Sequence, residues 1–155
     1  MFKQARGVRP VETSPPGELV DRLGYLFKHA QLRLGELTAE ALAPHGVTGR
    51  ELAVLIVLAS RGPASQQEAA GRLGIDRTTM VAFLDDLEDR GLVTRRPGPA
   101  DRRRNVVVLT PAGEDTLRRA RKAGEEAERR FLAPLSGSAA EQLRRALRKL
   151  VQSAR

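Results

Sequence analysis

The chain has 155 residues, and its 27 basic and 19 acidic side chains give a formal charge of +8. This length suits one domain with a sizeable core, and the lack of cysteine excludes disulfides, thiolate catalysis and cysteine zinc sites. The sequence contains no apolar run long enough to span a membrane or to form the core of an export signal, so we expect a cytoplasmic protein.

The N-terminal half predicts an arm and two helices. Residues 1–17 are rich in proline and glycine and are expected to form a flexible arm. Apolar residues then recur at helical spacing, which predicts a helix over residues 18–42. Thr48 and Glu51 stand three apart as a capping-box pair, and the apolar run LAVLIVLA behind them predicts a short, buried, central helix.

Two further short helices are expected in the middle of the chain. Ser65 and Glu68 form a second capping box that opens the first of them, and Gly74 supplies a turn after it. Asp76 is suited to cap the next helix, which should end near Gly91. The inner face of that helix is predicted to consist of Met80, Phe83, Leu84 and Leu87.

Residues 92–110 have a different pattern, which predicts a β-hairpin. The runs LVTRR and NVVVLT are rich in β-branched residues and flank a Pro-Gly-Pro-Ala turn. Residues 95–104 hold five arginines against one aspartate, the densest basic excess in the chain. The hairpin is therefore expected to carry arginines at its tip and along its arms.

The C-terminal third predicts two helices. Thr110 followed by Pro111 is a good helix start, and this helix should run to about Leu135. Ser138 and Glu141 form a third capping-box pair before the last helix. One side of that helix is expected to be lined by Leu143, Leu147, Leu150 and Val151. Residues four apart on the long helix are expected to form ion pairs, Glu125 with Arg129 and Glu126 with Arg130.

The predicted fold is mainly α with a small β-hairpin. Two short capped helices joined at a glycine and followed by a basic hairpin describe a winged helix-turn-helix. In that arrangement the second helix fits the major groove of DNA, while arginines on the hairpin reach the neighbouring minor groove.

The segment SQQEAAGRLGIDRTTMVAFLDDLEDRGLVTRRPGPADRRRNVVVLTPAG resembles the core of the MarR (multiple-antibiotic-resistance regulator) family. The wing signature Asp-x-Arg followed by Leu-Thr occurs as DRRRNVVVLT, and LEDRGLV matches the entry into the wing. The resemblance covers about residues 18–153. It implies a DNA-binding lobe at about 48–110 and dimerisation helices at about 18–42 and 111–153.

The resemblance implies a homodimeric transcription regulator, commonly a repressor, that binds double-stranded DNA at a pseudo-palindromic operator. A small aromatic or anionic effector would lower its DNA affinity. By position, the expected DNA-contacting residues are Ser65, Gln66, Arg77, Thr78, Thr79, Val81, Ala82, Arg95, Arg96, Asp101, Arg102, Arg103 and Arg104.

Some of these residues carry more specific expectations. Asp101 would orient Arg103 toward the minor groove, and at most one of the two strand arginines, Arg95 or Arg96, can face DNA. Val81 and Ala82 stand where the family often has a polar pair, so base reading would rest partly on apolar contact with thymine methyl groups.

Several of the residues have simpler structural readings. Ser65 and Asp76 can act as helix caps alone, Thr79 can bond within its own helix, and Asp101 can be a plain turn residue. Arg102 and Arg104 can contact only solvent or phosphate.

The family places its ligand where the first helices meet the DNA-binding lobe, and the residues expected there are Leu26, His29, Arg33 and His45. The alternative is that both histidines are structural and Arg33 is a surface arginine. No cofactor and no metal are expected, because two histidines without cysteine make a poor metal site.

An enzyme is not expected, because the chain has no metalloprotease, nucleophile-elbow, phosphate-loop or dinucleotide-binding motif. The acidic cluster at residues 85–89 is interpreted as a hydrated helix face. The alternative function is a winged-helix module that binds RNA or a protein partner without sensing a ligand, and comparing binding to double-stranded DNA and RNA would separate the two.

Overall fold

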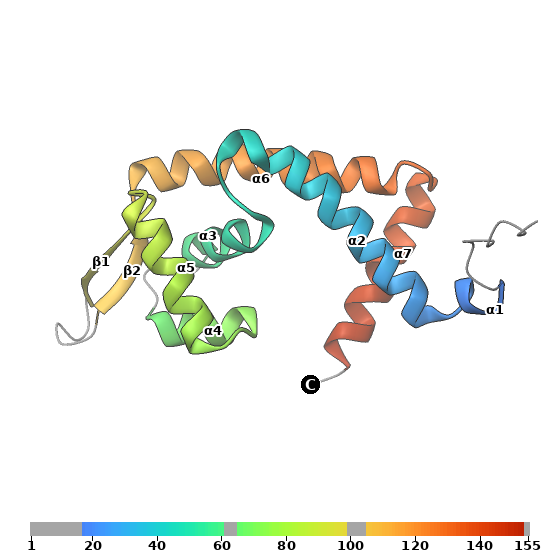
Figure 1. The fold of residues 1–155 in the computed structure, drawn as a ribbon, viewed down its shortest axis with the longest axis horizontal. Coiled ribbons are helices and arrows are strands. Elements are labelled where there is room, and N and C mark those ends of the chain that lie inside the picture. Colours follow the sequence, from blue (N-terminus) through green and yellow to red (C-terminus); the bar gives the residue numbers. More distant parts are fainter. Residues whose placement is uncertain (1–16, 61–64, 99–104, 154–155) are drawn as a thin grey trace, which may run out of the picture. The chain divides into compact units, whose positions relative to one another are not determined.

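The computed structural model describes residues 17–60, 65–98 and 105–153, so most of the predicted arm and the tip of the hairpin lie outside the described residues. The elements in chain order are α1 (Gly17–Val20), α2 (Leu23–Leu42), the 3-10 helix η1 (Ala43–His45), α3 (Gly49–Ser60), α4 (Gln66–Leu73), α5 (Arg77–Asp89), β1 (Val93–Pro97), β2 (Asn105–Leu109), α6 (Pro111–Leu132) and α7 (Gly137–Gln152) (Figure 1). The chain divides into two compact units, Met1–Leu32 and Arg33–Arg155.

The first unit contains α1 and the N-terminal part of α2. The single helix predicted over residues 18–42 is wrong in one respect, because the chain turns between α1 and α2. Arg22 N donates to Leu19 O at 3.1 Å, a tight three-residue turn. Asp21 begins this break, and aspartate competes with the helical backbone for hydrogen bonds. The large apolar side chains exposed in this unit are Leu19, Leu23, Leu26, Phe27 and Leu32.

The second unit is built around α3, as the apolar run predicted. This helix packs against α4, α5, α6 and β2. Val54 and Leu55 are at most 1 % exposed, and they meet Met80, Leu84 and Leu87 of α5 in one apolar cluster. The buried face predicted for α5 is therefore confirmed, with Phe83 partly buried at its edge.

The hairpin is also confirmed. Strands β1 and β2 pair antiparallel, with Val93 opposite Leu109 and Pro97 opposite Asn105. Val93 and Val107 are 2 % and 1 % exposed, so one face of the hairpin completes the core of the second unit. The other face is left for the polar and basic residues of the strands.

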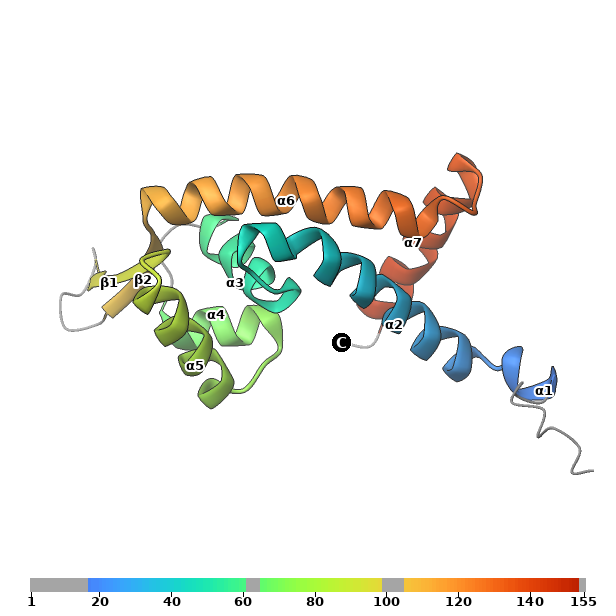
Figure 2. The same cartoon turned by 45° about the horizontal axis from the view of Figure 1, so that its top comes forward.

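The base of the hairpin joins the start of α6 in a close contact, and Figure 2 shows these two segments side by side. Thr110 Oγ1 donates to Gly91 O at 2.6 Å and accepts from Gly113 N at 3.0 Å. Thr110 N donates to Leu92 O at 3.1 Å. A Cβ atom built on Gly113 would lie 1.9 Å from Leu92 O, so only glycine fits there.

The junction between α6 and α7 differs from the prediction. Helix α6 ends at Leu132 rather than near Leu135. The N-cap of α7 is Ser136, whose Oγ accepts from a backbone N–H three residues later at 3.3 Å, so the capping box predicted for Ser138 and Glu141 is wrong. Ser136 has the extended backbone that a cap requires, whereas Ser138 already lies inside the helix.

The ion pairs predicted on α6 are also different. Arg129 pairs with Glu126, three residues away, instead of with Glu125. Arg130 reaches Glu40 of α2 at 3.3 Å instead of pairing with Glu126. The carboxylate partner of Arg130 therefore lies on another helix.

No single helix among the described residues is long and apolar enough to cross a membrane. The bent pair Leu23–His45 and Gly49–Ser60 meets the criterion of length and composition. The second member of this pair is the core helix α3.

Candidate nucleic-acid interface

Helices α4 and α5 form the predicted helix-turn-helix. Ser65 N donates to Glu68 Oε2 at 2.8 Å, and Glu68 N donates to Ser65 Oγ at 3.2 Å, which is the predicted capping box. Gly74 ends α4 at φ 64°, a left-handed conformation that glycine adopts readily. The turn that follows places the N-terminus of α5 beside α4.

Asp76 caps α5. Its Oδ1 accepts from Thr79 N at 2.9 Å, and its Oδ2 accepts from the Thr79 hydroxyl at 2.6 Å. These hydrogen bonds from the side chain and backbone of Thr79 lower the pKa of Asp76 below its ordinary value. The hydroxyl of Thr79 thus bonds to the cap of its own helix, as the structural interpretation of Thr79 predicted.

The first two turns of α5 present a surface to solvent. Arg77, Thr78 and Ala82 are exposed, while Thr79 and Val81 are half-buried. The N-terminus of a helix carries partial positive charge, and the cation of Arg77 offsets the neighbouring carboxylate of Asp76. This part of α5 is therefore suited to approach a polyanion, with the Thr78 hydroxyl and the Ala82 methyl group available for base edges.

The two strand arginines have different environments. Arg96 is exposed, whereas the Arg95 side chain is 24 % exposed and faces α5. The guanidinium of Arg95 pairs with Asp85 and Glu88, and its backbone N donates to Glu88 Oε1 at 2.9 Å. With the Gln66 amide oxygen turned toward it, Arg95 also donates from Nε and Nη2 at 3.0 and 3.1 Å.

Burial alone would lower the pKa of Arg95, but the hydrogen bonds and charges of Asp85 and Glu88 raise it above its ordinary value. Arg95 thus joins β1 to α5 and α4. Its carboxylate partners also revise the interpretation of residues 85–89 as a merely hydrated face. A direct contact between Arg95 and DNA stays a prediction.

A polar cavity of about 370 Å³ lies where α4, α5 and the hairpin meet. Its lining comprises Ser65, Gln66, Gln67, Arg77, Arg95, Asn105 and Val107. Four of these are predicted DNA-contacting residues. Asp101, Arg102, Arg103 and Arg104 lie outside the described residues, and their roles stay predictions.

The four predicted ligand residues have separate surroundings. His29 lies beside Tyr25, with 4.0 Å between ring centroids, and Leu26 is 50 % exposed. Arg33 is exposed and pairs with Glu36 at 3.2 Å, as a surface arginine would. His45 borders a cavity of about 330 Å³ on α6 that is also lined by cationic side chains.

Another cavity, of about 430 Å³, lies between the second half of α2, α3 and α6 and includes none of those four residues. Its lining is Leu34, Thr38, Gly49, Leu52, Ala53, Ile56, Arg121, Gly124, Glu125 and Glu128. The signal for this cavity in the sequence is the spacing of Leu34 and Thr38, four apart on one helix face. No group of three or more metal-ligating side chains occurs among the described residues.

Comparison with known proteins gives consistent results. Residues 45–104 match the sequence model of the MarR family. The transcriptional regulator HosA of Escherichia coli O111:H- is 33% identical over 108 residues, which are 69% of this chain and 79% of HosA.

Two solved structures are also similar. The transcriptional repressor CouR bound to a 23-mer DNA duplex is 39% identical, with 90% of this chain and 96% of that chain covered and a TM-score of 0.80. CouR from Rhodococcus jostii RHA1 bound to p-coumaroyl-CoA is 26% identical, with 87% and 95% covered and a TM-score of 0.76.

Proposed function

Because the chain belongs to the MarR family of DNA-binding transcription regulators, which are not enzymes, we propose that it is a sequence-specific repressor of transcription that binds double-stranded DNA as a homodimer. The observation that carries this proposal is the exposed first half of α5 beside a hairpin that Arg95 attaches to it. This pair of elements can enter a major groove and the neighbouring minor groove together. A cytoplasmic location stays our prediction.

The dimer is supported by the apolar side chains that the single chain leaves in solvent. Leu143, Leu150 and Val151 are exposed on the last helix. In the proposed dimer, residues 18–42 and 111–153 supply the interface, and the lobe at 48–110 binds DNA. Two copies of α5 then meet half-sites about 10 bp apart on a pseudo-palindrome.

We further propose that a small effector binds the protein and lowers its affinity for DNA. The support is the relative bound to p-coumaroyl-CoA, together with the cavity between α2, α3 and α6. Its volume of about 430 Å³ lies within the usual range for small-ligand sites. Its lining includes the cation of Arg121 together with the carboxylates of Glu125 and Glu128, of which Glu128 is paired with Arg144. Leu26, His29, Arg33 and His45 remain the alternative site.

Selection of bound sequences from a random duplex pool tests the central claim. We expect a pseudo-palindrome to emerge, and we expect its affinity to fall with salt by about 0.9 in log slope per neutralised phosphate. Arg103→Ala should weaken binding to every duplex and leave the dimer intact, whereas Thr78→Ala should change the preferred sequence.

Equal affinity for an A-form RNA duplex of the same sequence would favour the alternative module, because a major-groove helix cannot enter the deep groove of RNA. Affinity for DNA that does not depend on salt would contradict the proposal outright.

A further inference from the structure

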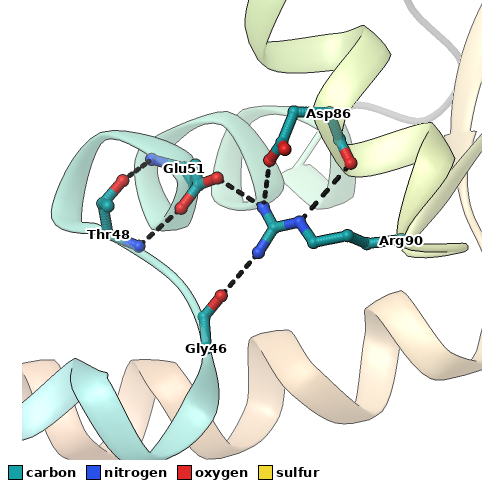
Figure 3. Close-up of polar contacts among 5 residues, drawn as sticks. All are labelled: Gly46, Thr48, Glu51, Asp86 and Arg90. Carbon is teal, nitrogen blue, oxygen red and sulfur yellow. Dashed lines mark hydrogen bonds and ion pairs between the residues drawn. The ribbon is translucent and has the colours of Figure 1, made fainter.

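Arg90, the residue that follows α5, contacts Gly46, Glu51 and Asp86 (Figure 3). Its Nη1 donates to the carbonyl of Gly46 at 2.5 Å, at the end of η1. Its Nη2 pairs with Glu51 of α3, and it also lies 2.7 Å from Asp86 Oδ2 within α5. One planar guanidinium therefore joins the end of α5 to both sides of the connection between η1 and α3.

Glu51 uses both carboxylate oxygens in this cluster. Oε2 accepts from Thr48 N at 2.6 Å, and Oε1 accepts from Arg90. Glu51 is only 7 % exposed, which is uncommon for a glutamate unless it is paired. Removal of Arg90 would leave this carboxylate buried with its charge uncompensated.

Helix α5 is held by apolar contacts along one face and by directional polar contacts at its C-terminal half. Met80, Leu84 and Leu87 bury the apolar face, and the hydrophobic effect that drives this burial is non-directional. The directional contacts lie at its C-terminal half, where Arg95 holds the hairpin and Arg90 holds the η1–α3 connection. The two arginines thus anchor α5 on different neighbours.

We propose that Glu51 and Arg90 are positioning residues, which set the orientation of α5 relative to the η1–α3 connection and thereby the distance between the two recognition helices of the dimer. This inference rests on the proposed dimeric DNA binding. The pair would act on DNA only indirectly, since Arg90 is at the opposite end of α5 from the exposed Arg77 and Thr78. Its signature is a change in the preferred half-site spacing rather than in the preferred bases.

The test uses the full-length protein and a series of duplexes that carry the selected half-sites with the selected spacer and with spacers one base pair longer or shorter. The measured quantity is the ratio of affinities between the selected and the altered spacers. We expect Arg90→Gln to reduce this ratio at least fivefold, while affinity for a duplex without the operator changes less than twofold.

Matched variants separate positioning from folding and from charge. Asp86→Asn removes only the contact within α5, and Arg72→Gln removes one exposed positive charge from α4; both should keep the wild-type ratio. Arg90→Lys retains the charge but lacks the planar guanidinium that contacts Gly46 through Nη1 and Glu51 through Nη2, so it should lose most of the discrimination. It carries the test if Arg90→Gln does not fold.

The outcomes are distinguishable. If the wild type discriminates between spacers and both folded Arg90 variants keep the ratio within twofold, the positioning role is overturned and the proposed function stands. A wild type that binds DNA with no spacer preference, or does not bind it, overturns the proposed function and this inference with it. If Arg90→Gln does not fold, a reduced ratio in Arg90→Lys, together with a wild-type ratio in Arg72→Gln, supports the inference.

Discussion

Replacement of Gly113 by alanine should destabilise the protein, although alanine is the better helix former. Glycine in a helix interior is about 1 kcal/mol less favourable than alanine, so the helix alone would gain up to that amount. The new Cβ, however, would lie 1.9 Å from Leu92 O, where ordinary contact begins at 3.4 Å. The obstacle is backbone, which cannot rotate away as a side chain can.

The magnitude follows from three contributions. Overpacking of this kind costs about 1–3 kcal/mol. Moving Leu92 away also strains its hydrogen bond from Thr110 N, which contributes about 1 kcal/mol. Less the helix gain of about 1 kcal/mol, Gly113→Ala should lower the free energy of unfolding by about 1–3 kcal/mol.

Urea unfolding followed by far-UV circular dichroism measures this change, with all variants at one protein concentration, because the stability of the proposed dimer would depend on that concentration. Gly71→Ala is the matched control: it lies inside α4 and its Cβ would meet nothing within 4 Å, so it should gain up to about 1 kcal/mol. A Gly113→Ala protein as stable as the wild type, with an unchanged m-value, would refute the argument from close approach.

Four other predictions follow from the surroundings of Asp76, Thr110, Arg95 and Arg96. Bonds from Thr79 lower the pKa of Asp76 in the folded state, so its stabilising contribution is present above the unfolded pKa and lost as pH falls through the folded pKa. The stability advantage of the wild type over Asp76→Asn, measured by urea unfolding at several pH values, should therefore shrink as the solution is acidified, and an advantage that stays constant would contradict this. Thr110→Val removes the hydroxyl bonds to the hairpin base and to α6, and should lower the free energy of unfolding by about 1–2 kcal/mol in urea titrations. Arg95→Gln should lower it by about 1 kcal/mol, because the paired guanidinium is part-exposed. Arg96→Gln should leave stability unchanged within about 0.5 kcal/mol and reduce the salt slope of DNA binding by about 1, as fluorescence anisotropy would measure.

The elements were predictable where their signals are local. Thr48, Ser65 and Asp76 each cap a helix through a bond to a residue three positions away, so a short stretch of sequence contains both partners. The same reasoning was wrong at Ser138, because Ser136 stands two residues earlier and is an equally good cap. Side-chain chemistry alone does not choose between two serines when the end of the preceding helix is uncertain.

The roles of the arginines were less predictable because their partners are distant in sequence. Arg90 binds the carbonyl of Gly46, which is 44 positions away, and no pattern in the chain relates the two. Arg95 and Arg96 were expected to point in opposite directions, and they do, but the sequence does not say which of them faces α5. That choice depends on the register of the hairpin against the helix.

The carboxylates near the C-terminal end of α5 make the two ends of this helix differ in charge. Arg77 stands at its first position, and Asp85, Asp86, Glu88 and Asp89 occupy four of its last five positions. A helix of this length spans about 20 Å, more than twice the screening length of about 8 Å at physiological salt. Arg90 and Arg95 offset two of these four negative charges, so the C-terminal end of α5 keeps a negative excess that repels a duplex separately from the N-terminal end. The resulting electrostatic torque would turn the protein so that the N-terminal end of α5 approaches DNA first. The rate of productive encounters would then rise before any base is contacted.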